Sequence, residues 1–244
     1  GSGDLTFAPM LVEAGLAGLP IILSTGMANL DEIKRALEFI AFGQAQAAGI
    51  VPTNAVPTRI AIEAAWAAPA VQNLLVGTVT ILHCTTQYPA SPHMLNLRAM
   101  TTIAERFGLP VGYSDHSLGR LASTIAVTLG ATVIEKHFTL DKTLEGPDHS
   151  ASLDADELVE FVRELREVEV MLGSKVKECQ PEEVANREVV RRSIVATRPI
   201  AQGATIETIA VECRRPLGGR TSFDYWEVVG TIAERDYEPG EYVG

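Results

Sequence analysis

Two histidines are candidates for chemistry because each follows a short apolar run within a few residues. His116 comes after Tyr113-Ser114-Asp115, and His137 comes after Ile134-Glu135-Lys136. Two imidazoles, together with water and substrate oxygens, suit a divalent transition metal that keeps open coordination positions. A lone histidine is more often hydrogen-bonded in a protein core. The pairing, with Asp115 and Glu135 beside the histidines, favours metal ligands.

Four apolar runs in the chain end in polar or titratable residues. The four ends are Ser24-Thr25-Gly26-Met27, His83-Cys84-Thr85-Thr86, Ser114-Asp115-His116 and Glu135-Lys136-His137. Serine and aspartate at such positions also cap helices, so each end alone is equally well explained by structure. Active sites of α/β barrels are built from the C-terminal ends of the strands. Four successive polar ends therefore favour one shared site.

Four further residues are weaker candidates for a role in the site. Asp148 lies in Gly146-Pro147-Asp148, on the loop after the fourth run. Its carboxylate is a candidate acid, base or sugar-hydroxyl partner, although aspartate is common in turns. His83 is expected to have a supporting role, and His93 and His149 are expected to be ordinary polar loop residues.

The elements that must position these residues alternate between strand and helix. The four apolar runs, 20–23, 79–82, 111–113 and 132–134, predict buried parallel strands. A helical pattern follows each run, and the alternation predicts a parallel α/β sheet. The expected caps are Asn29 with Glu32, Asn96, and Asp154 with Glu157, and the face expected to point inward after the third strand is Leu118, Leu121, Ile125 and Leu129.

Two segments do not follow this alternation of strand and helix. Residues 41–78 are alanine-rich and contain Pro52, Pro57 and Pro69, which predicts a helical surface insertion without chemistry. Beyond Gly173 a polar stretch predicts a linker, and the short β-branched runs after it predict a small β-rich domain. We therefore expect a first domain over 1–173, a linker over 174–188 and a second domain over 189–244.

The composition of the chain limits the classes of partner that it is expected to bind. The 244 residues carry a net charge of -11, which disfavours nucleic acid and anionic membranes as partners. An anionic substrate would need a local site made by a metal, a few basic side chains or helix N-termini. The three cysteines, Cys84, Cys179 and Cys213, form no C-x-x-C motif, so neither a disulfide framework nor a structural zinc site is expected. No apolar run reaches membrane-spanning length, and a cytoplasmic location is expected.

The strand-end motifs also carry a resemblance. Leu23–Met27, His83–Pro89, Tyr113–His116 and Ile134–Thr139, followed by Gly146-Pro147-Asp148, are similar in order and spacing to the N-acetylneuraminate (sialic acid) synthase family. Arg191–Ala196 and Arg214-Arg215-Pro216 resemble the C-terminal antifreeze-like (SAF) domain of that family. Apart from residues 41–78, the resemblance covers nearly the whole chain.

The resemblance implies a fold and a reaction. The fold would be a (β/α)8 TIM barrel, here apparently without its N-terminal strands, joined to a small β-rich SAF domain. The reaction would condense phosphoenolpyruvate with an N-acylated aminohexose, such as N-acetylmannosamine, to give a nonulosonic (sialic) acid and phosphate. A homodimer is implied in which the SAF domain reaches over the barrel of the partner. With the first strands absent, we expect this 244-residue chain to have weak activity or none.

The resemblance also assigns roles residue by residue. A divalent metal, Mn²⁺ or Mg²⁺, would bind His116 and His137, polarise the sugar aldehyde and hold the attacking water. Positions that match phosphoenolpyruvate-binding residues are Ser2, Ser24, Thr86 and Ser114. Positions that match residues facing the sugar and the metal are Tyr88, Glu135 and Asp148. Arg215 matches the arginine that the SAF domain offers to the N-acyl group in the partner's site.

Two alternatives remain open from the sequence. One is another phosphoenolpyruvate–aldose condensing barrel, which the C-terminal domain disfavours. The other is a non-catalytic module that binds carbohydrate or protein and kept the fold. Phosphate release from phosphoenolpyruvate in the presence of the amino sugar distinguishes an enzyme from a binding module.

Overall fold

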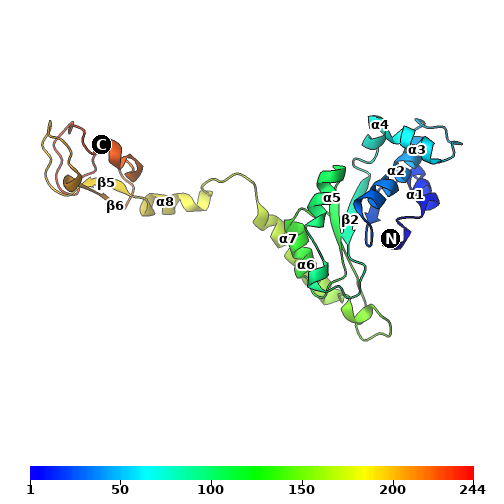
Figure 1. The fold of residues 1–244 in the computed structure, drawn as a ribbon. Helices are drawn as coiled ribbons and strands as arrows, with labels where there is room; N and C mark the ends of the chain where they lie inside the picture. The colour runs from blue at the N-terminus through cyan, green and yellow to red at the C-terminus, as the bar shows by residue number, and fades with distance from the viewer. The chain divides into compact units, whose positions relative to one another are not determined.

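The computed structural model describes all residues, Gly1–Gly244. The chain forms two compact units, Gly1–Gly173 and Ser174–Gly244 (Figure 1). The first unit is α/β, with a single parallel sheet, and the second contains a small antiparallel sheet.

The sheet of the first unit holds four parallel strands in chain order. They are β1 (Ile21–Ser24), β2 (Val79–Cys84), β3 (Val111–Asp115) and β4 (Ile134–Lys136). These are the four strands expected from the sequence, with ends shifted by up to two residues. The strands correspond to half of an eight-stranded barrel, and their C-terminal ends meet at one edge.

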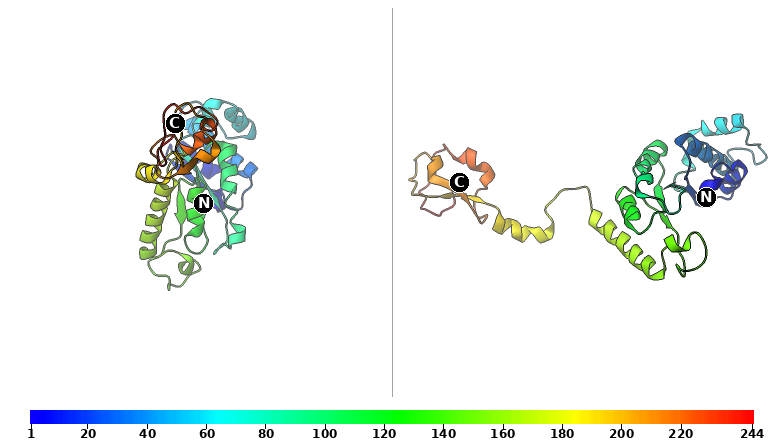
Figure 2. Two further views of the ribbon diagram at one scale, coloured as in Figure 1. Left: turned by 90° about the vertical axis from the view of Figure 1, so that its left-hand side faces the viewer. Right: turned by 60° about the horizontal axis from the view of Figure 1, so that its bottom comes forward.

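Helices and short 3-10 turns connect the strands. They are η1 (Ser2–Asp4), α1 (Ala8–Leu16), α2 (Leu30–Ala47), α3 (Arg59–Trp66), α4 (Pro69–Asn73), η2 (Pro92–Met94), α5 (Ala99–Phe107), α6 (Leu121–Thr128), η3 (His149–Ala151) and α7 (Ala155–Leu172). Figures 1 and 2 show α6 and α7 side by side. The capping boxes expected at Asn29 with Glu32 and at Asp154 with Glu157 are both present.

Two glycines let α1 lie directly against α2. A Cβ on Gly15 would overlap the backbone carbonyl of Ile40, and one on Gly43 would overlap that of Val12. The helices therefore approach at backbone contact, a distance that only glycine permits. This packing anchors α1, and with it the η1 turn that carries Ser2 to the end of β1.

Three local expectations were wrong. The helix after β2 begins at Ala99 with Arg98 as its N-cap, because Asn96 takes a left-handed conformation (φ 43°) in the turn that follows η2. Residues 41–47 belong to the buried end of α2, so the helical insertion is confined to α3, α4 and their loops. The third wrong expectation is the inward face predicted for α6.

The large apolar residues of α6 and its preceding loop face outward. Leu118, Leu121, Ile125 and Leu129 are all exposed, and they line a groove of about 820 Å³ between α6 and residues 89–98, the segment that precedes α5. The small residues Ala122, Ser123 and Ala126 are the ones buried in this helix. Small side chains allow a closer helix–sheet approach, so the buried stripe is the one that periodicity of large residues did not identify.

A buried ion pair joins the ends of β3 and β4. Lys136 Nζ lies 3.0 Å from Asp115 Oδ2, and the two side chains are 4% and 0% exposed. The second oxygen of Asp115 accepts hydrogen bonds from the backbone N–H and the hydroxyl of Ser117 at 2.8 and 2.7 Å. Ser123 donates to Asp115 Oδ2 at 2.6 Å, and Lys136 also donates to the Ser117 carbonyl at 2.8 Å. Every strong hydrogen-bonding atom of the pair is therefore satisfied.

The second unit begins with a polar segment that contains η4 (Pro181–Glu183) and α8 (Val184–Val190), a helix that the sequence analysis did not predict. Its sheet pairs β5 (Ser193–Ala196) with β6 (Val211–Arg214) in antiparallel register. Three short elements complete it: η5 (Thr208–Ala210), η6 (Ser222–Asp224) and α9 (Tyr225–Val228). A separate apolar core includes Ile194, Val211 and Val243. In the whole chain, no helix has the length and apolar character needed to cross a membrane.

The Asp115–Lys136 pair is expected to contribute strongly to stability. Lys136→Met leaves the Asp115 carboxylate buried without its cation, and we expect a loss of about 3–5 kcal/mol in the free energy of unfolding. Urea denaturation measures the loss. Arg120→Gln, which removes the exposed pairs to Glu160 and Glu164, is the control and should have a much smaller effect. Equal losses in the two variants would contradict the assignment.

Candidate active site at the C-terminal ends of the strands

Three hydroxyl groups gather around Gly26 in the turn after β1. Ser2 Oγ lies 2.9 Å from Ser24 Oγ and accepts a hydrogen bond from the Gly26 N–H at 2.8 Å. A Cβ on Gly26 would overlap Thr86 Oγ1 and come within 2.7 Å of Ser2 Oγ. Thr86 Oγ1 is buried and has no hydrogen-bond partner within the protein. We call this group of Ser2, Ser24, Gly26 and Thr86 the hydroxyl cradle.

Two imidazoles and a phenol ring form a second cluster at the same edge of the sheet. The ring centroids of His116 and His137 are 5.2 Å apart, and the rings are nearly perpendicular. The Tyr88 ring lies 4.1 Å from that of His116 and 5.4 Å from that of His137. Asp148 Oδ2 lies 3.7 Å from His137 Nδ1. Residues from the loop after β2, the ends of β3 and β4 and the loop before α7 thus converge.

Ser114 connects the imidazole cluster to Glu135. Its hydroxyl donates to Glu135 Oε1 at 2.7 Å and lies 3.4 Å from His116 Nε2. Ser114 and Glu135 are register partners across β3 and β4, so their side chains leave the sheet on the same face. Asp115 and Lys136, one residue further along each strand, point to the opposite face. Asp115, although it is next to His116 in the sequence, therefore points away from the face that carries Ser114 and Glu135.

Burial and hydrogen bonds together shift the pKa values of the groups in this cluster. Burial lowers the pKa of His116, but bonds to Cys84 and to the Thr85 carbonyl outweigh it and raise the pKa overall. Burial raises the pKa of the Cys84 thiol, yet the interaction with His116 outweighs it and lowers that pKa. Burial and the nearby acidic groups Cys84, Asp148 and Glu135 raise the pKa of Tyr88. These shifts indicate that the groups act on one another within a single site.

The donor groups fit a divalent metal with few protein ligands. His116 Nδ1 lies 2.8 Å from the Thr85 carbonyl, so Nδ1 carries the proton and Nε2 keeps its lone pair. The carbonyl partner is the kind of second contact that orients a metal-ligating histidine. No group of three or more His, Cys, Asp or Glu side chains is arranged to hold a metal ion. An ion at His116 and His137 would therefore take its remaining ligands from water or substrate oxygens.

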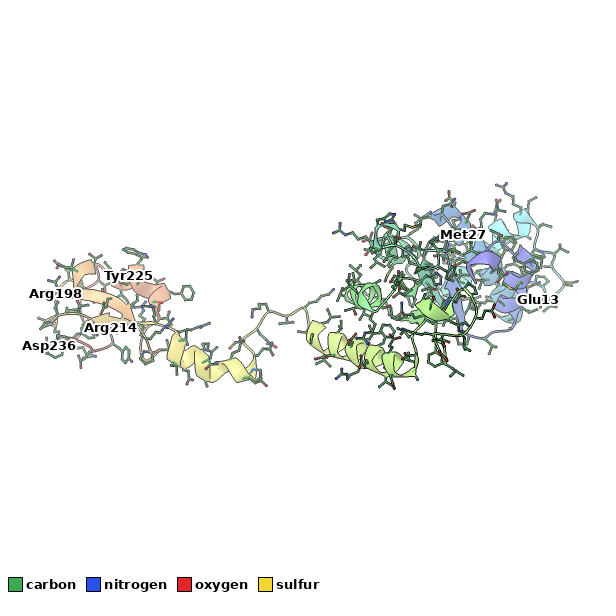
Figure 3. All side chains as sticks on the ribbon, turned by 90° about the horizontal axis from the view of Figure 1, so that it is seen from below. Glu13, Met27, Arg198, Arg214, Tyr225 and Asp236 are labelled. Atoms are coloured by element: carbon green, nitrogen blue, oxygen red, sulfur yellow. The ribbon has the colours of Figure 1, made fainter.

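Two other candidates from the sequence, His83 and His93, lie outside these groups, and a third, Arg215, belongs to the second unit. His83 faces the helices, where its Nε2 lies 2.7 Å from the Leu95 carbonyl and its ring stacks on Tyr113 at 6.0 Å. His93 lies in η2. Arg215 follows directly in sequence after Arg214, the last residue of β6, which Figure 3 labels in the second unit.

Sequence reasoning missed two groups that act on His116. Cys84 Sγ lies 3.6 Å from His116 Nδ1, and the Thr85 carbonyl orients the same nitrogen. Cys84 stands inside a strand-end motif, and its register position opposite Ser114 was the available signal. A contact made by a backbone carbonyl, such as that of Thr85, cannot be inferred from residue type.

The chain belongs to the NeuB family, whose model matches residues 1–177, and the SAF domain model matches residues 191–244. The N,N'-diacetyllegionaminic acid synthase of Legionella pneumophila is 39% identical over 98% of this chain and 60% of its own length. The human N-acetylneuraminate-9-phosphate synthase is 35% identical over 89% of this chain and 53% of its own length. The chain thus spans little more than half the length of these relatives.

The fold of a solved structure agrees with this assignment. The crystal structure of N-acetylneuraminic acid (sialic acid) synthetase from Leptospira borgpetersenii, in complex with citrate, superposes with a TM-score of 0.59 at 30% identity. The match covers 76% of this chain and 54% of that chain.

The partly buried His83 should make stability depend on pH. Burial lowers its pKa below the ordinary 6.5, so the unfolded chain binds the proton more tightly than the folded one. His83 therefore supports the fold fully above pH 6.5, and that support is lost as pH falls through 6.5 toward the lower folded pKa. His83→Gln keeps an N–H donor without titrating. We expect urea midpoints measured from pH 7.5 to about 5 to fall less in this variant than in the parent, and parallel curves would contradict the assignment.

Proposed function

We propose that this chain forms part of a synthase that condenses phosphoenolpyruvate with an N-acylated aminohexose and yields a nonulosonic (sialic) acid and phosphate. The observation that carries the proposal is the hydroxyl cradle beside the His116–His137 pair, at one end of a parallel sheet. Membership of the NeuB family, and relatives that are named as synthases of such acids, support it.

The chemistry asks for two kinds of group. The C3 carbon of phosphoenolpyruvate bonds to the aldehyde carbon of the open-chain sugar, water adds to C2, and the phosphate leaves. One part of the site must bind a phosphate dianion, and the other must polarise a carbonyl and handle protons. The cradle and the imidazole cluster supply these two parts.

The hydroxyl cradle is the proposed phosphoenolpyruvate site, with Ser114 beside it. Thr86 Oγ1 has no partner in the protein, so a substrate oxygen can take its hydrogen bond without breaking another one. Hydroxyl and backbone N–H donors bind phosphate without a net positive charge, which suits a chain with a charge of -11. Placement of donors before the substrate arrives lowers the cost of binding it.

His116 and His137 are the proposed ligands of a divalent ion, Mn²⁺ or Mg²⁺. Such an ion supplies Lewis-acid polarisation of the sugar aldehyde. The Thr85 carbonyl holds the His116 ring in the required tautomer, and Tyr88 packs against both rings and limits their rotation.

Glu135, Asp148 and Tyr88 are the proposed groups that face the amino sugar. Glu135 accepts the Ser114 hydroxyl proton in a hydrogen bond, which orients its carboxylate toward the cradle. Asp148 lies beside His137 and is half exposed, so it can reach a sugar hydroxyl. Arg215 is the proposed contact to the N-acyl group of the sugar in a partner chain, within a homodimer that exchanges its SAF domains.

Loss of either imidazole tests the proposal directly. With phosphoenolpyruvate, N-acetylmannosamine and Mn²⁺, we expect the full-length protein to release phosphate, and His116→Ala or His137→Ala to reduce the rate by at least about a hundredfold. A panel that includes diacetamido-trideoxyhexoses identifies the preferred sugar. Retained activity in either variant would remove that residue from the metal site, and release with an unacylated aldose alone would indicate a different condensing enzyme.

Gly26→Ala tests the cradle separately. The added Cβ would overlap Thr86 Oγ1 and crowd Ser2 Oγ, so the three hydroxyls must move apart. We expect the KM for phosphoenolpyruvate to rise by about tenfold or more, since a small displacement of binding groups is costly. Mn²⁺ affinity, measured by calorimetry, should be unchanged. Gly3→Ala, whose added Cβ would meet no atom within 4 Å, controls for general effects of the substitution; an unchanged KM in Gly26→Ala would contradict the cradle.

A further inference from the structure

The loop that carries Asp148 is closed at its base beside His137. It connects β4 to α7 and contains residues 140–152. The Leu153 N–H donates to the His137 carbonyl at 2.9 Å, and the Thr139 N–H donates to the Leu153 carbonyl at 2.8 Å. The two ends of the loop are thus held against the residue whose imidazole Asp148 approaches.

The buried hydroxyl of Thr139 forms hydrogen bonds inside this loop. Thr139 is 4% exposed, and its Oγ1 donates to the Asp141 carbonyl at 3.0 Å and accepts from the Asp141 N–H at 3.2 Å. The same oxygen lies 2.8 Å from His149 Nδ1. Because the single hydroxyl proton is used on Asp141, His149 Nδ1 must be the donor in this bond. His149 is therefore tied to the start of its own loop.

Asp148 has little else to fix its carboxylate. The Ser152 N–H and hydroxyl donate to its backbone carbonyl at 3.1 and 2.8 Å, which holds the main chain. The side chain itself is 48% exposed, and its near ionic partner is His137 at 3.7 Å. The direction of the carboxylate thus follows the direction of the loop backbone, which the neighbouring His149 anchors.

We propose that His149 is a positioning residue, whose hydrogen bond to the buried Thr139 hydroxyl keeps the Asp148 carboxylate over the amino-sugar side of the site. The inference rests on the proposed function, because it takes Asp148 as a group that faces the sugar. It replaces the expectation that His149 is an ordinary polar loop residue.

Kinetics of the full-length protein test the hydrogen bond between His149 and Thr139 through variants of both residues. For His149→Ala and Thr139→Val, we expect kcat/KM for the amino sugar to fall by about tenfold or more, with the KM for phosphoenolpyruvate and the Mn²⁺ affinity within about twofold of the parent. His149→Asn places an amide N–H near the position of Nδ1, and Thr139→Ser keeps the hydroxyl. Both should restore most of the loss. Thr143→Val, which removes only the exposed contact to Asp141 in the same loop, is the matched control and should have no effect.

A double-mutant cycle tests whether the effect passes through Asp148. In an Asp148→Asn background, His149→Ala should cause little further loss, and hydrogen exchange across 140–152 should be faster in His149→Ala than in the parent. Additive losses, or a parent-like kcat/KM in both His149→Ala and Thr139→Val, would overturn the inference alone. A parent protein that releases no phosphate with any sugar of the panel would overturn the proposed function, and this inference with it.

Discussion

The pairing of β3 with β4 is the constraint on which the candidate site depends. Side chains alternate across a strand, so Ser114 and Glu135 leave one face while Asp115 and Lys136 leave the other. On the hidden face, the two charges neutralise each other at 3.0 Å and bind the loop after β3. On the open face, the next residues, His116 and His137, come within 5.2 Å between ring centroids. β4 has only three residues, so the buried pair stabilises an attachment that backbone hydrogen bonds alone would hold weakly.

The sequence allowed the parallel order of the strands and the convergence of their ends to be predicted, because both follow from general properties of βα units. Asp115 was noted only for its proximity to His116 in the sequence, although the period of two within each strand was also available. Alternation places it on the far face, where a charge needs a partner, and Lys136 is that partner. The buried face of α6 was predicted wrongly for a related reason. Its buried residues are the small Ala122, Ser123 and Ala126, whereas a hydrophobicity pattern favours the larger apolar side chains.

The contacts that orient the site could not be read from residue types. The Thr85 carbonyl fixes the His116 tautomer, and the tie between His149 and Thr139 depends on the path of a loop. The close contact of Gly26 with Ser2 and Thr86 depends on a turn that brings three separate segments together. Each is a property of tertiary structure, whereas strand ends and capping boxes are local in sequence and were found correctly.

The two parts of the site differ in how they meet the excess negative charge of the chain. The cradle offers hydroxyl groups that are held in place without a ligand, so in the proposed function it would bind an anion without a basic side chain. The imidazole cluster instead sits between the acidic residues Glu135 and Asp148. Carboxylates beside two imidazoles would favour a cation between them, and a bound cation would in turn lower the repulsion that these carboxylates exert on a phosphate nearby. In the proposed function, the acidic residues would therefore favour binding of the cation, and the bound cation would in turn favour binding of the anion in the same site.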